Sequence, residues 1–411
     1  MRYRGPQNQQ IDLNSPVSSR KKRVWIFVLI ALVVLSVVIW MFFIRPKPKQ
    51  GIGDIQKAKA QEQSVRLIAV GDNIPHDTVN QQAIKNGNGT YNYLPIYDQI
   101  QPFFAQSDLR FCNQEAAVGG VELGISGYPT FNAPVEFAKD LHKLGCNIIN
   151  TANNHVADKG LPGIINTRDI WDTLTPSAVS GANRSVDEQN KVNYFEKKGI
   201  KFAFVAFNEY SNNKSIPTYA LNGFDEELVS RLLKEARNSA DFVIVSAHWG
   251  TEDSPEINSA QEMWAKSFAD NGADLVIGTG PHVLQPVKEI PNSRGSKTLV
   301  WFSIGNFMSS QLKINELVGG IASMEIAKTN GKASIKSIGF LPTYMHYDWS
   351  AADATNQNLL ARKNLKLYPL DKADNVLNSS TLNTTVQAQQ DYVKGILNKF
   401  TPVTIYSSDK F

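Results

Sequence analysis

Short clusters of acidic, amide and imidazole side chains recur along the chain, and each follows a run of apolar or β-branched residues. Four of the six histidines lie in these clusters, and three of the four share their cluster with Asp, Asn or Glu. Carboxylate oxygens, amide oxygens and neutral imidazoles suit divalent metals such as Mn²⁺, Zn²⁺ or Fe²⁺. In chain order the clusters are GDNIPH (71–76), NQE (113–115), NNHVAD (153–158), HWGTE (248–252), GPH (280–282) and GN (305–306). The pattern predicts a site for one or two divalent metal ions.

Each cluster taken alone has an ordinary structural explanation. An Asp such as Asp72 after a strand is typically a cap or turn residue, and a lone His282 is commonly a hydrogen-bonded structural residue. The joint occurrence of these side chains after successive apolar runs favours a functional site. His142, inside an amphipathic stretch, and His346, beyond the core strands, keep the structural interpretation.

The elements that must position these clusters alternate along the chain. Apolar runs predict strands at 65–70, 109–112, 147–151, 202–207, 242–247, 274–277 and 298–304. Amphipathic stretches predict helices at 93–105, 134–144, 161–174, 226–239 and 255–271. Such alternation is typical of α/β crossover units. Ligands of open α/β sheets bind at the carboxyl ends of the strands, so we expect the clusters to converge there.

The alternation of predicted strands and helices ends after residue 315. Two alternating runs, 321–327 and 333–340, flank Asn330-Gly331, which is a strong hairpin signal. This pattern predicts an antiparallel edge or a second sheet that completes a main domain at 64–345. Residues 346–411 are more polar, and we expect a C-terminal extension with a last helix at 386–400.

The segment 24–44 has no charge and only Ser36 as a polar interruption. As a helix it would be about 31 Å long, enough to span a membrane and too long for the core of a cleaved signal peptide. We expect an uncleaved transmembrane helix between a basic tail at 1–23 and a linker at 45–63. The cluster at 20–23 is the denser basic flank, so we place the N-terminus in the cytoplasm and the main domain outside the cell.

Charge is unevenly distributed along the chain. Of the formal net charge of +4, residues 1–23 contribute +5 and residues 45–60 contribute +4, which leaves −5 for residues 61–411. This excess of acidic residues argues against a nucleic-acid partner.

Cys112 and Cys146 are the two cysteines, and both lie in the part placed outside the cell. One disulfide is possible. Free cysteines are often simply buried, so the preferred interpretation is two small buried apolar residues.

The clusters resemble the successive motifs of the capsule-biosynthesis CapA/PgsA family, which is implicated in poly-γ-glutamate production. The resemblance covers roughly residues 65–310 and rests on GDNIPH, NQE, TANNHVADKG, AHWGTE, GPHVLQP and FSIGNF, in family order. The family belongs structurally to the calcineurin-like metallophosphoesterases. The resemblance therefore implies an α/β fold, a four-layer αββα sandwich of the metallophosphoesterase type, preceded here by the transmembrane helix.

The resemblance also implies roles for individual residues. The metal ligands that it implies are Asp72, Glu115, Asn154, His248 and His282. It places His155 beside the leaving oxygen, where an imidazole could protonate a departing alkoxide. Asp158 and Glu252 are candidates for orienting the imidazoles through hydrogen bonds.

Two positions depart from the family pattern. His76 lies four residues after Asp72, so the Asp-x-His opening of typical metallophosphoesterases is absent. Gly280-Pro281-His282 stands where the family usually has His-Pro-His. One ligand is therefore missing, which favours a mononuclear site or a binding role without turnover.

Together these features predict a membrane-anchored protein of capsule biosynthesis with a metal-dependent hydrolase or phosphoesterase-like site. The expected partners are the membrane, the membrane subunits of a polymer synthase, and an anionic polymer or phosphoester substrate. One alternative is a non-catalytic scaffold or export subunit, which Gly280 supports. Another is an extracellular nucleotidase, which would need aromatic residues for base recognition. Aromatic residues such as those at Trp249, Trp301, Tyr347 and Trp349 more often serve packing.

Overall fold

The computed structural model of the protein describes residues 30–38, residue 40 and residues 63–411, which belong to two units, Met1–Gln61 and Glu62–Phe411. In the first unit, residues 30–38 are helical. Within the described ranges we find no helix that is both long and apolar enough to cross a membrane. The predicted tail, most of the predicted transmembrane segment 24–44 and nearly all of the linker lie outside the described residues. The membrane anchor therefore stays a prediction.

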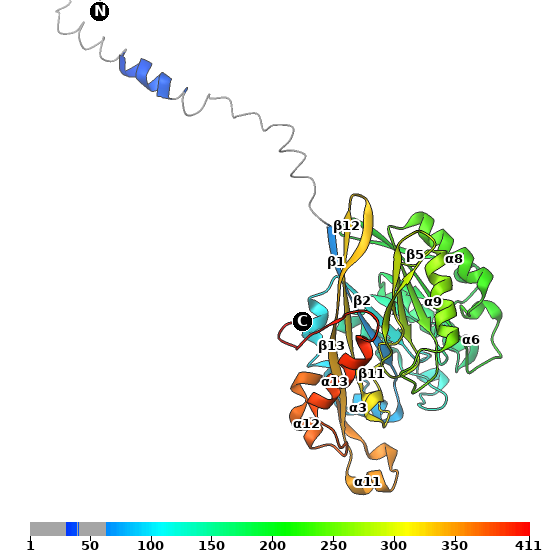
Figure 1. The fold of residues 1–411 in the computed structure, drawn as a ribbon. Helices are drawn as coiled ribbons and strands as arrows, with labels where there is room; N and C mark the ends of the chain where they lie inside the picture. The colour runs from blue at the N-terminus through cyan, green and yellow to red at the C-terminus, as the bar shows by residue number, and fades with distance from the viewer. Residues whose placement is uncertain (1–29, 39, 41–62) are drawn as a thin grey trace, which may run out of the picture. The chain divides into compact units, whose positions relative to one another are not determined.

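The second unit is a mixed α/β structure with two sheets, as Figure 1 shows. The first sheet has nine strands in the order β14-β13-β12-β1-β2-β3-β4, with β11 beside β1 and β15 beside β13. The second sheet has six strands in the order β5-β6-β7-β8-β10-β9. The predicted α/β class is confirmed.

The strands of the first sheet are β1 (Gln63–Asn73), β2 (Leu109–Gln114), β3 (Ile148–Asn150), β4 (Ala178–Ser180), β11 (Asn306–Met308), β12 (Val318–Thr329), β13 (Lys332–Asp348), β14 (Lys363–Pro369) and β15 (Thr404–Ile405). Those of the second are β5 (Asn193–Lys197), β6 (Ile200–Asn208), β7 (Phe242–His248), β8 (Leu275–Thr279), β9 (Val287–Pro291) and β10 (Lys297–Trp301). Strands β1 to β4 run parallel, as do β6, β7, β8 and β10. All seven predicted strands are present, and β12 and β13 form the predicted hairpin.

The helices are α3 (Asp77–Asn86), α4 (Gln101–Ala105), α5 (Val135–Leu144), α6 (Gly160–Leu174), α7 (Val186–Gln189), α8 (Glu226–Ser239), α9 (Ser259–Asn271), α10 (Ile314–Leu317), α11 (Ala351–Thr355), α12 (Asp374–Asn378) and α13 (Val386–Leu397), with short 3₁₀ turns η2 (Leu94–Tyr97), η3 (Val121–Leu123), η4 (Thr218–Ala220), η5 (Leu359–Ala361) and η6 (Leu370–Lys372). The helix predicted at 93–105 is instead split into η2 and α4. Pro102 has no amide hydrogen and clashes with the preceding turn, so a continuous helix through it is disfavoured.

The two sheets pack face to face. Successive side chains of a strand point to opposite faces: Phe202 and Phe204 of β6 belong to the core shared with the first sheet, whereas Val205 belongs to the core formed with α8 and α9. Since the second sheet covers one face of the first, the crossover helices between β2, β3 and β4 must cover the other. The layers are therefore helices, first sheet, second sheet and helices.

Residues 346–411 pack as part of the second unit. Strands β14 and β15 pair with β13, and α13 contributes Val393 and Leu397 to the shared core. Among the described residues, the buried apolar clusters run from Val65 to Val403 and lie entirely in the second unit. The described residues 30–38 and 40 contribute no side chain to these clusters.

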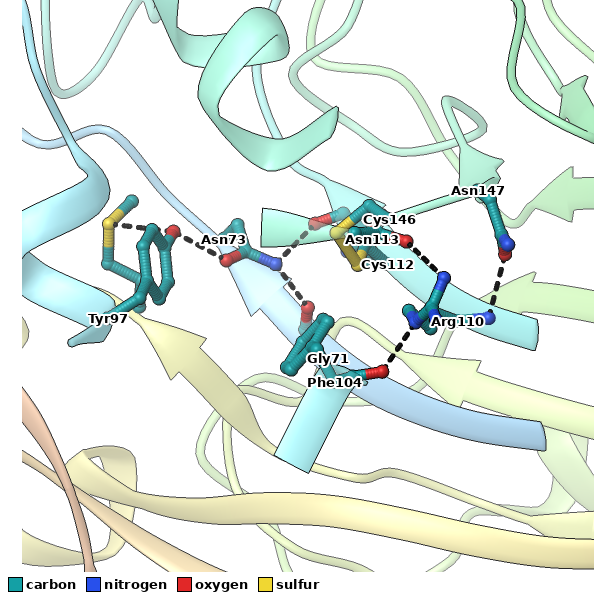
Figure 2. Close-up of a disulfide and its surroundings, with 11 residues drawn as sticks. Gly71, Asn73, Tyr97, Phe104, Arg110, Cys112, Asn113, Cys146 and Asn147 are labelled. Atoms are coloured by element: carbon teal, nitrogen blue, oxygen red, sulfur yellow. Dashed lines mark hydrogen bonds between the residues drawn. A yellow bond between two sulfur atoms is a disulfide. The ribbon is translucent and has the colours of Figure 1, made fainter. Parts of the chain in front are cut away.

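Cys112 and Cys146 form a disulfide, so the interpretation as two free buried cysteines is wrong. Cys112 lies in β2 and Cys146 just before β3, and the parallel pairing of these strands brings the two Cα atoms within 5.9 Å. Figure 2 shows Arg110 beside the disulfide, with its Nε donating to the Phe104 carbonyl at 2.6 Å and its backbone N–H donating to Asn147 Oδ1 at 2.8 Å. A sequence separation of 34 residues gives no hint of this proximity.

Candidate metal centre

The predicted clusters meet at one end of the two sheets. Asp72 lies near the end of β1 and pairs in register with Asn113 near the end of β2. Glu115 follows β2, Asn154 follows β3, His248 ends β7, and His282 follows β8. All of these strands present their carboxyl ends here, as expected for a ligand site of parallel sheets. The structure brings the five predicted ligands together.

Asp72 and His282 form a buried pair. Asp72 Oδ2 lies 3.0 Å from His282 Nδ1, and Asp72 Oδ1 accepts a hydrogen bond from Asn113 Nδ2 at 2.7 Å. Burial alone would raise the pKa of Asp72, but the hydrogen bond and charge of His282 outweigh it and lower that pKa. Burial alone would lower the pKa of His282, but the hydrogen bond to Asp72 raises it. Asn306 Oδ1, 3.1 Å from the same Nδ1, helps to hold the imidazole.

Glu115 is completely buried beside this pair. Its Oε2 accepts from Asn113 Nδ2 at 3.2 Å, whereas its Oε1 has no hydrogen-bond partner among the described residues. That Oε1 lies 3.8 Å from His248 Nε2 and 3.7 Å from His282 Nε2. Burial first, and then the charge of Asp72, raise the pKa of Glu115 well above its usual range.

This donor set fits a divalent metal ion. Asp72, Glu115 and His248 each offer one ligand atom, and these atoms lie within 4.8 Å of one another. A buried carboxylate oxygen without a partner is costly unless an ion or water satisfies it. Carboxylate, amide and imidazole donors favour Mn²⁺, Zn²⁺ or Fe²⁺ over a soft metal.

His248 is held in position to bind a cation through Nε2. This atom lies 3.0 Å from Asn154 Oδ1, and Nδ1 lies 3.0 Å from Thr279 Oγ1. Burial lowers the pKa of His248 to about 3. The imidazole is therefore neutral, which is the form that binds metals. Thr279 was not among the predicted site residues, because its only sequence signal is its place as the last residue of an apolar strand.

His155 is fixed by the partner that was expected for it. Its Nδ1 lies 2.7 Å from Asp158 Oδ2, which also accepts the Phe131 N–H at 2.7 Å. The Phe131 ring meets the imidazole edge-on at 4.6 Å. Asn212 Nδ2, 3.2 Å from Nδ1, approaches from a loop that carried no sequence signal. Asp158 and Asn212, which both contact His155, also line a groove of about 420 Å³.

Glu252 and His76 lie in the predicted clusters but do not contact the expected partners. Glu252 accepts from the Tyr210 hydroxyl at 3.0 Å, and no hydrogen bond between Glu252 and an imidazole occurs in the part of the chain that the structure describes. Thr279, and not Glu252, holds the imidazole of His248. His76 accepts from the Ser310 N–H at 3.3 Å and does not join the ligands. Burial, and then the charge of Arg362, lower the pKa of His76 to about 3.

Gly280 occupies the position where the family pattern has a histidine. Its φ is +106°, a conformation that L side chains rarely adopt. A Cβ at this position would lie 2.9 Å from the Trp249 carbonyl oxygen and 3.2 Å from His248 Nε2. A histidine therefore cannot be restored here without a change in the backbone.

We expect Gly280→Ala to cost about 1–3 kcal/mol of folding free energy and to weaken metal binding, because the new methyl group crowds His248. The matched control is Gly331→Ala in the β12–β13 turn, where φ is +77° and nothing lies within 4 Å of the added Cβ. The control should lose about 1 kcal/mol of folding free energy, because alanine is disfavoured at a positive φ, and it should keep its metal affinity. Urea unfolding and metal titration measure both quantities, and equal metal affinities for the two variants would contradict the crowding argument.

Comparison with known proteins places these residues in a family context. The model of the family described as bacterial capsule synthesis protein PGA_cap matches residues 66–311. The PGA biosynthesis protein CapA of Bacillus subtilis (strain 168) is 28% identical over 225 residues, which cover 53% of this chain and 57% of that protein. The capsule biosynthesis protein CapA of Bacillus anthracis is 28% identical over 187 residues, 44% of each chain. The matches thus span about half the length of these curated relatives.

Two solved structures show a weaker similarity. The calcineurin-like phosphoesterase YfkN from Bacillus subtilis gives a TM-score of 0.39 at 13% identity, covering 82% of this chain and 99% of that chain. A phosphatase from Mycoplasma pneumoniae gives a TM-score of 0.41 at 13% identity, covering 68% and 94%. Similarity at this level supports no conclusion about the chemistry of the site.

Proposed function

The chain belongs to the family of bacterial capsule synthesis proteins, and from this premise we propose that it serves surface-polymer production through a metal-dependent, phosphoesterase-like hydrolase site. The observation that carries the proposal is the buried Oε1 of Glu115, which faces His248 and His282 and has no hydrogen-bond partner among the described residues. A four-layer sandwich of the metallophosphoesterase type is the proposed fold. The proposed substrate is poly-γ-glutamate, a related anionic polymer or a phosphoester. The names of the two relatives, a PGA biosynthesis protein and a capsule biosynthesis protein, support the polymer.

The residues divide into a metal-holding group and a proton-donating group. One or two ions held by Asp72, Glu115, Asn154, His248 and His282 would supply Lewis acidity and a lowered pKa for bound water. His155, oriented by Asp158 through Nδ1, keeps Nε2 to give a proton to a leaving oxygen. The groove lined by Asp158 and Asn212 would give the leaving group room.

We propose that the protein is a single-pass protein of the cell membrane, anchored by 24–44, with the N-terminus in the cytoplasm and the main domain outside the cell. The uncharged segment 24–44 supports the anchor. The buried disulfide between Cys112 and Cys146 supports the location of the domain, because disulfides persist mainly in oxidising compartments. The membrane subunits of a polymer synthase are the proposed partners.

The nucleotidase alternative has less support. Trp249 and Trp301 are 1% and 0% exposed, so neither can stack on a base. Tyr347 and Trp349 pack over the guanidinium of Arg362. These contacts agree with the expectation that the aromatic residues serve packing.

Metal content and hydrolysis test the proposed chemistry. We expect purified residues 62–411 to retain bound metal and to hydrolyse a phosphodiester, phosphomonoester or γ-glutamyl substrate. His155→Asn should lower kcat by roughly 10²- to 10³-fold with bound metal unchanged, because it removes only the proton donor. His248→Ala should lose both metal and activity. Absence of metal together with no activity that responds to these variants would contradict the proposal.

A non-catalytic scaffold or export subunit is the second candidate function, and Gly280 is the observation that favours it. Polymer production in cells distinguishes the two. Under the hydrolase proposal, Asp72→Ala and His248→Ala should both abolish capsule formation at unchanged protein levels. Normal capsule levels in both variants would favour the scaffold.

A further inference from the structure

Arg362 is a buried cation without a counter-ion. It is 8% exposed, and it forms no ion pair with a carboxylate in the part of the chain that the structure describes. Its Nε donates to the Leu359 carbonyl at 2.8 Å, and its Nη1 donates to the Ser310 carbonyl. The guanidinium also lies over the rings of Tyr347 and Trp349, at 5.3 and 5.9 Å from their centroids. All of these groups are neutral. A buried charge is costly unless an opposite charge pairs with it, and a bound anion would supply that charge.

Arg362 comes from the C-terminal extension but lies close to the metal centre. It directly follows η5, and η5 contacts α3, which begins directly after His76. Figure 1 shows α3 and α11 of the extension at the end of the domain away from the start of β1. Burial first, and then the charges of Arg362, His282 and His155, lower the pKa of His76 to about 3. His76 is therefore close to Arg362 and to two imidazoles of the predicted clusters.

A chain of contacts joins Arg362 to a predicted metal ligand. Asn306 Oδ1 lies 3.1 Å from His282 Nδ1, and Asn306 Nδ2 donates to Gln311 Oε1. The Gln311 carbonyl accepts from the Tyr347 hydroxyl at 2.8 Å. The Tyr347 ring in turn packs against the guanidinium of Arg362. The residues after β11 therefore set the position of Arg362 relative to His282.

His76 offers a neutral hydrogen-bond donor beside this cation. Its Nδ1 accepts from the Ser310 N–H at 3.3 Å, so the proton of the neutral ring lies on Nε2. Nε2 has no hydrogen-bond partner among the described residues, and the residue is half-buried. The ring meets Phe131 edge-on at 5.3 Å, and Phe131 meets His155 at 4.6 Å. His76 and His155, the proposed proton donor, therefore pack on the same aromatic ring.

We propose that Arg362 and His76 form an anion-binding subsite beside the metal centre, which holds a carboxylate or phosphate of the substrate next to the group that reacts. The inference rests on the proposed function, because it assigns this anion to the substrate of that site. A guanidinium pairs with carboxylate or phosphate oxygens through parallel N–H donors. An anionic polymer carries such a group on every repeating unit, so the subsite would select this class of substrate. Arg362 lies beyond residues 66–311, which the family model matches.

Anion binding by the metal-free full chain tests the subsite without turnover. After removal of metal with a chelator, calorimetric titration with inorganic phosphate and with a γ-linked glutamate dipeptide gives a Kd for each probe. We expect the wild type to bind at least one probe. Arg362→Met should weaken that binding roughly 10- to 100-fold, because it removes a charged hydrogen-bond donor. The probe that binds more tightly identifies phosphate or carboxylate as the anion of the substrate.

Arg110→Met is the matched control, since it makes the same change in charge. Arg110 also donates to a backbone carbonyl, that of Phe104, and it lies near the start of β2, at the other end of this strand from Glu115. Burial lowers the pKa of Arg110 and the charge of Asp108 opposes this, so this guanidinium has a nearby counter-charge. The control should bind both probes as the wild type does.

Urea unfolding shows which variants fold. If Arg362→Met does not, Arg362→Lys takes its place, because it keeps the charge and loses only the planar fork; it should bind the anion about 10-fold more weakly than the wild type. Equal anion binding by the Arg362 and Arg110 variants, or no binding of either probe by the wild type, would overturn the subsite. If Arg362 only held the residues after β11, its replacement would lower stability and leave the Kd for the anion unchanged, which also overturns it.

Hydrolysis distinguishes failure of the subsite from failure of the proposed function. With metal bound, Arg362→Met should raise KM for an anionic substrate more than it lowers kcat. Anion binding that depends on Arg362, in a wild-type protein that binds metal and hydrolyses nothing, would contradict the proposed hydrolase and support the subsite as a binding site.

Discussion

Replacing Glu115 by glutamine is expected to lower the affinity for divalent metal by on the order of 100-fold or more while the metal-free fold stays intact. Glu115 Oε1 is the atom toward which His248 Nε2 and His282 Nε2 both point, at 3.8 and 3.7 Å. Glutamine has the same shape but offers only a neutral amide to the cation. In the metal-free protein the raised pKa of Glu115 already favours its neutral form, so glutamine should be tolerated there.

The measurement is the shift of thermal unfolding on addition of Mn²⁺ or Zn²⁺. A ligand that binds only the folded state raises stability in proportion to the logarithm of its concentration over Kd. The wild type should show this rise, and Glu115→Gln should show little. The matched control is Glu316→Gln, which changes another buried carboxylate, one that accepts the backbone N–H groups of Leu312 and Lys313. This control should be less stable than the wild type, but its unfolding temperature should still rise when metal is added.

The pH dependence of the metal-free protein provides a second measure for the same variant. The folded state keeps a proton on Glu115 that the unfolded chain releases near the ordinary pKa of 4.5. The folding stability contributed by this group is therefore lost as pH rises from 4.5 toward the higher pKa of the folded state. Glu115→Gln has no proton to lose, so its unfolding free energy should increase relative to the wild type across this range. If the difference in unfolding free energy between the two proteins does not change with pH, Glu115 does not hold a proton in the folded state.

The central strands of the fold could be predicted because they are buried on both faces and appear as continuous apolar runs. β7 is one example, with every residue buried. The peripheral strands had no such signal. β5 alternates between half-buried and exposed residues, and β4 has only three residues. The polar helix α3 was also missed, since its sequence has little apolar periodicity.

The ligand residues could be predicted because chemistry restricts their types and parallel strands bring their carboxyl ends together. The groups that orient those ligands are less restricted. Thr279 and Asp158 both hold an imidazole, yet only the carboxylate stood out in the sequence. Asn212 comes from a loop more than 50 residues from His155 along the chain, and its approach depends on how the two sheets pack. Glu252 was expected to hold an imidazole and instead accepts from Tyr210.

The Cys112–Cys146 disulfide is expected to contribute about 4 kcal/mol to the folding free energy, because it closes a loop of roughly 35 residues in the unfolded chain. The closed loop contains Asn113 and Glu115 of the metal centre and Phe131, which packs on His155. Loss of the covalent link should therefore lower metal affinity as well as stability, since binding would have to order a looser segment. Urea unfolding and metal titration, each with and without a thiol reductant, measure the two effects.

The double variant Cys112→Ala with Cys146→Ala separates the cross-link from the packing of the sulfur atoms. Both cysteines are fully buried, so the alanines also leave a small cavity. Reduced wild-type protein keeps the sulfur atoms and loses only the bond. We expect reduction to remove most of the stability difference between wild type and double variant, and the reductant to leave the double variant unchanged. If reduced and oxidised wild-type proteins unfold at the same urea concentration, the bond contributes nothing and β2 and β3 are held by their pairing alone.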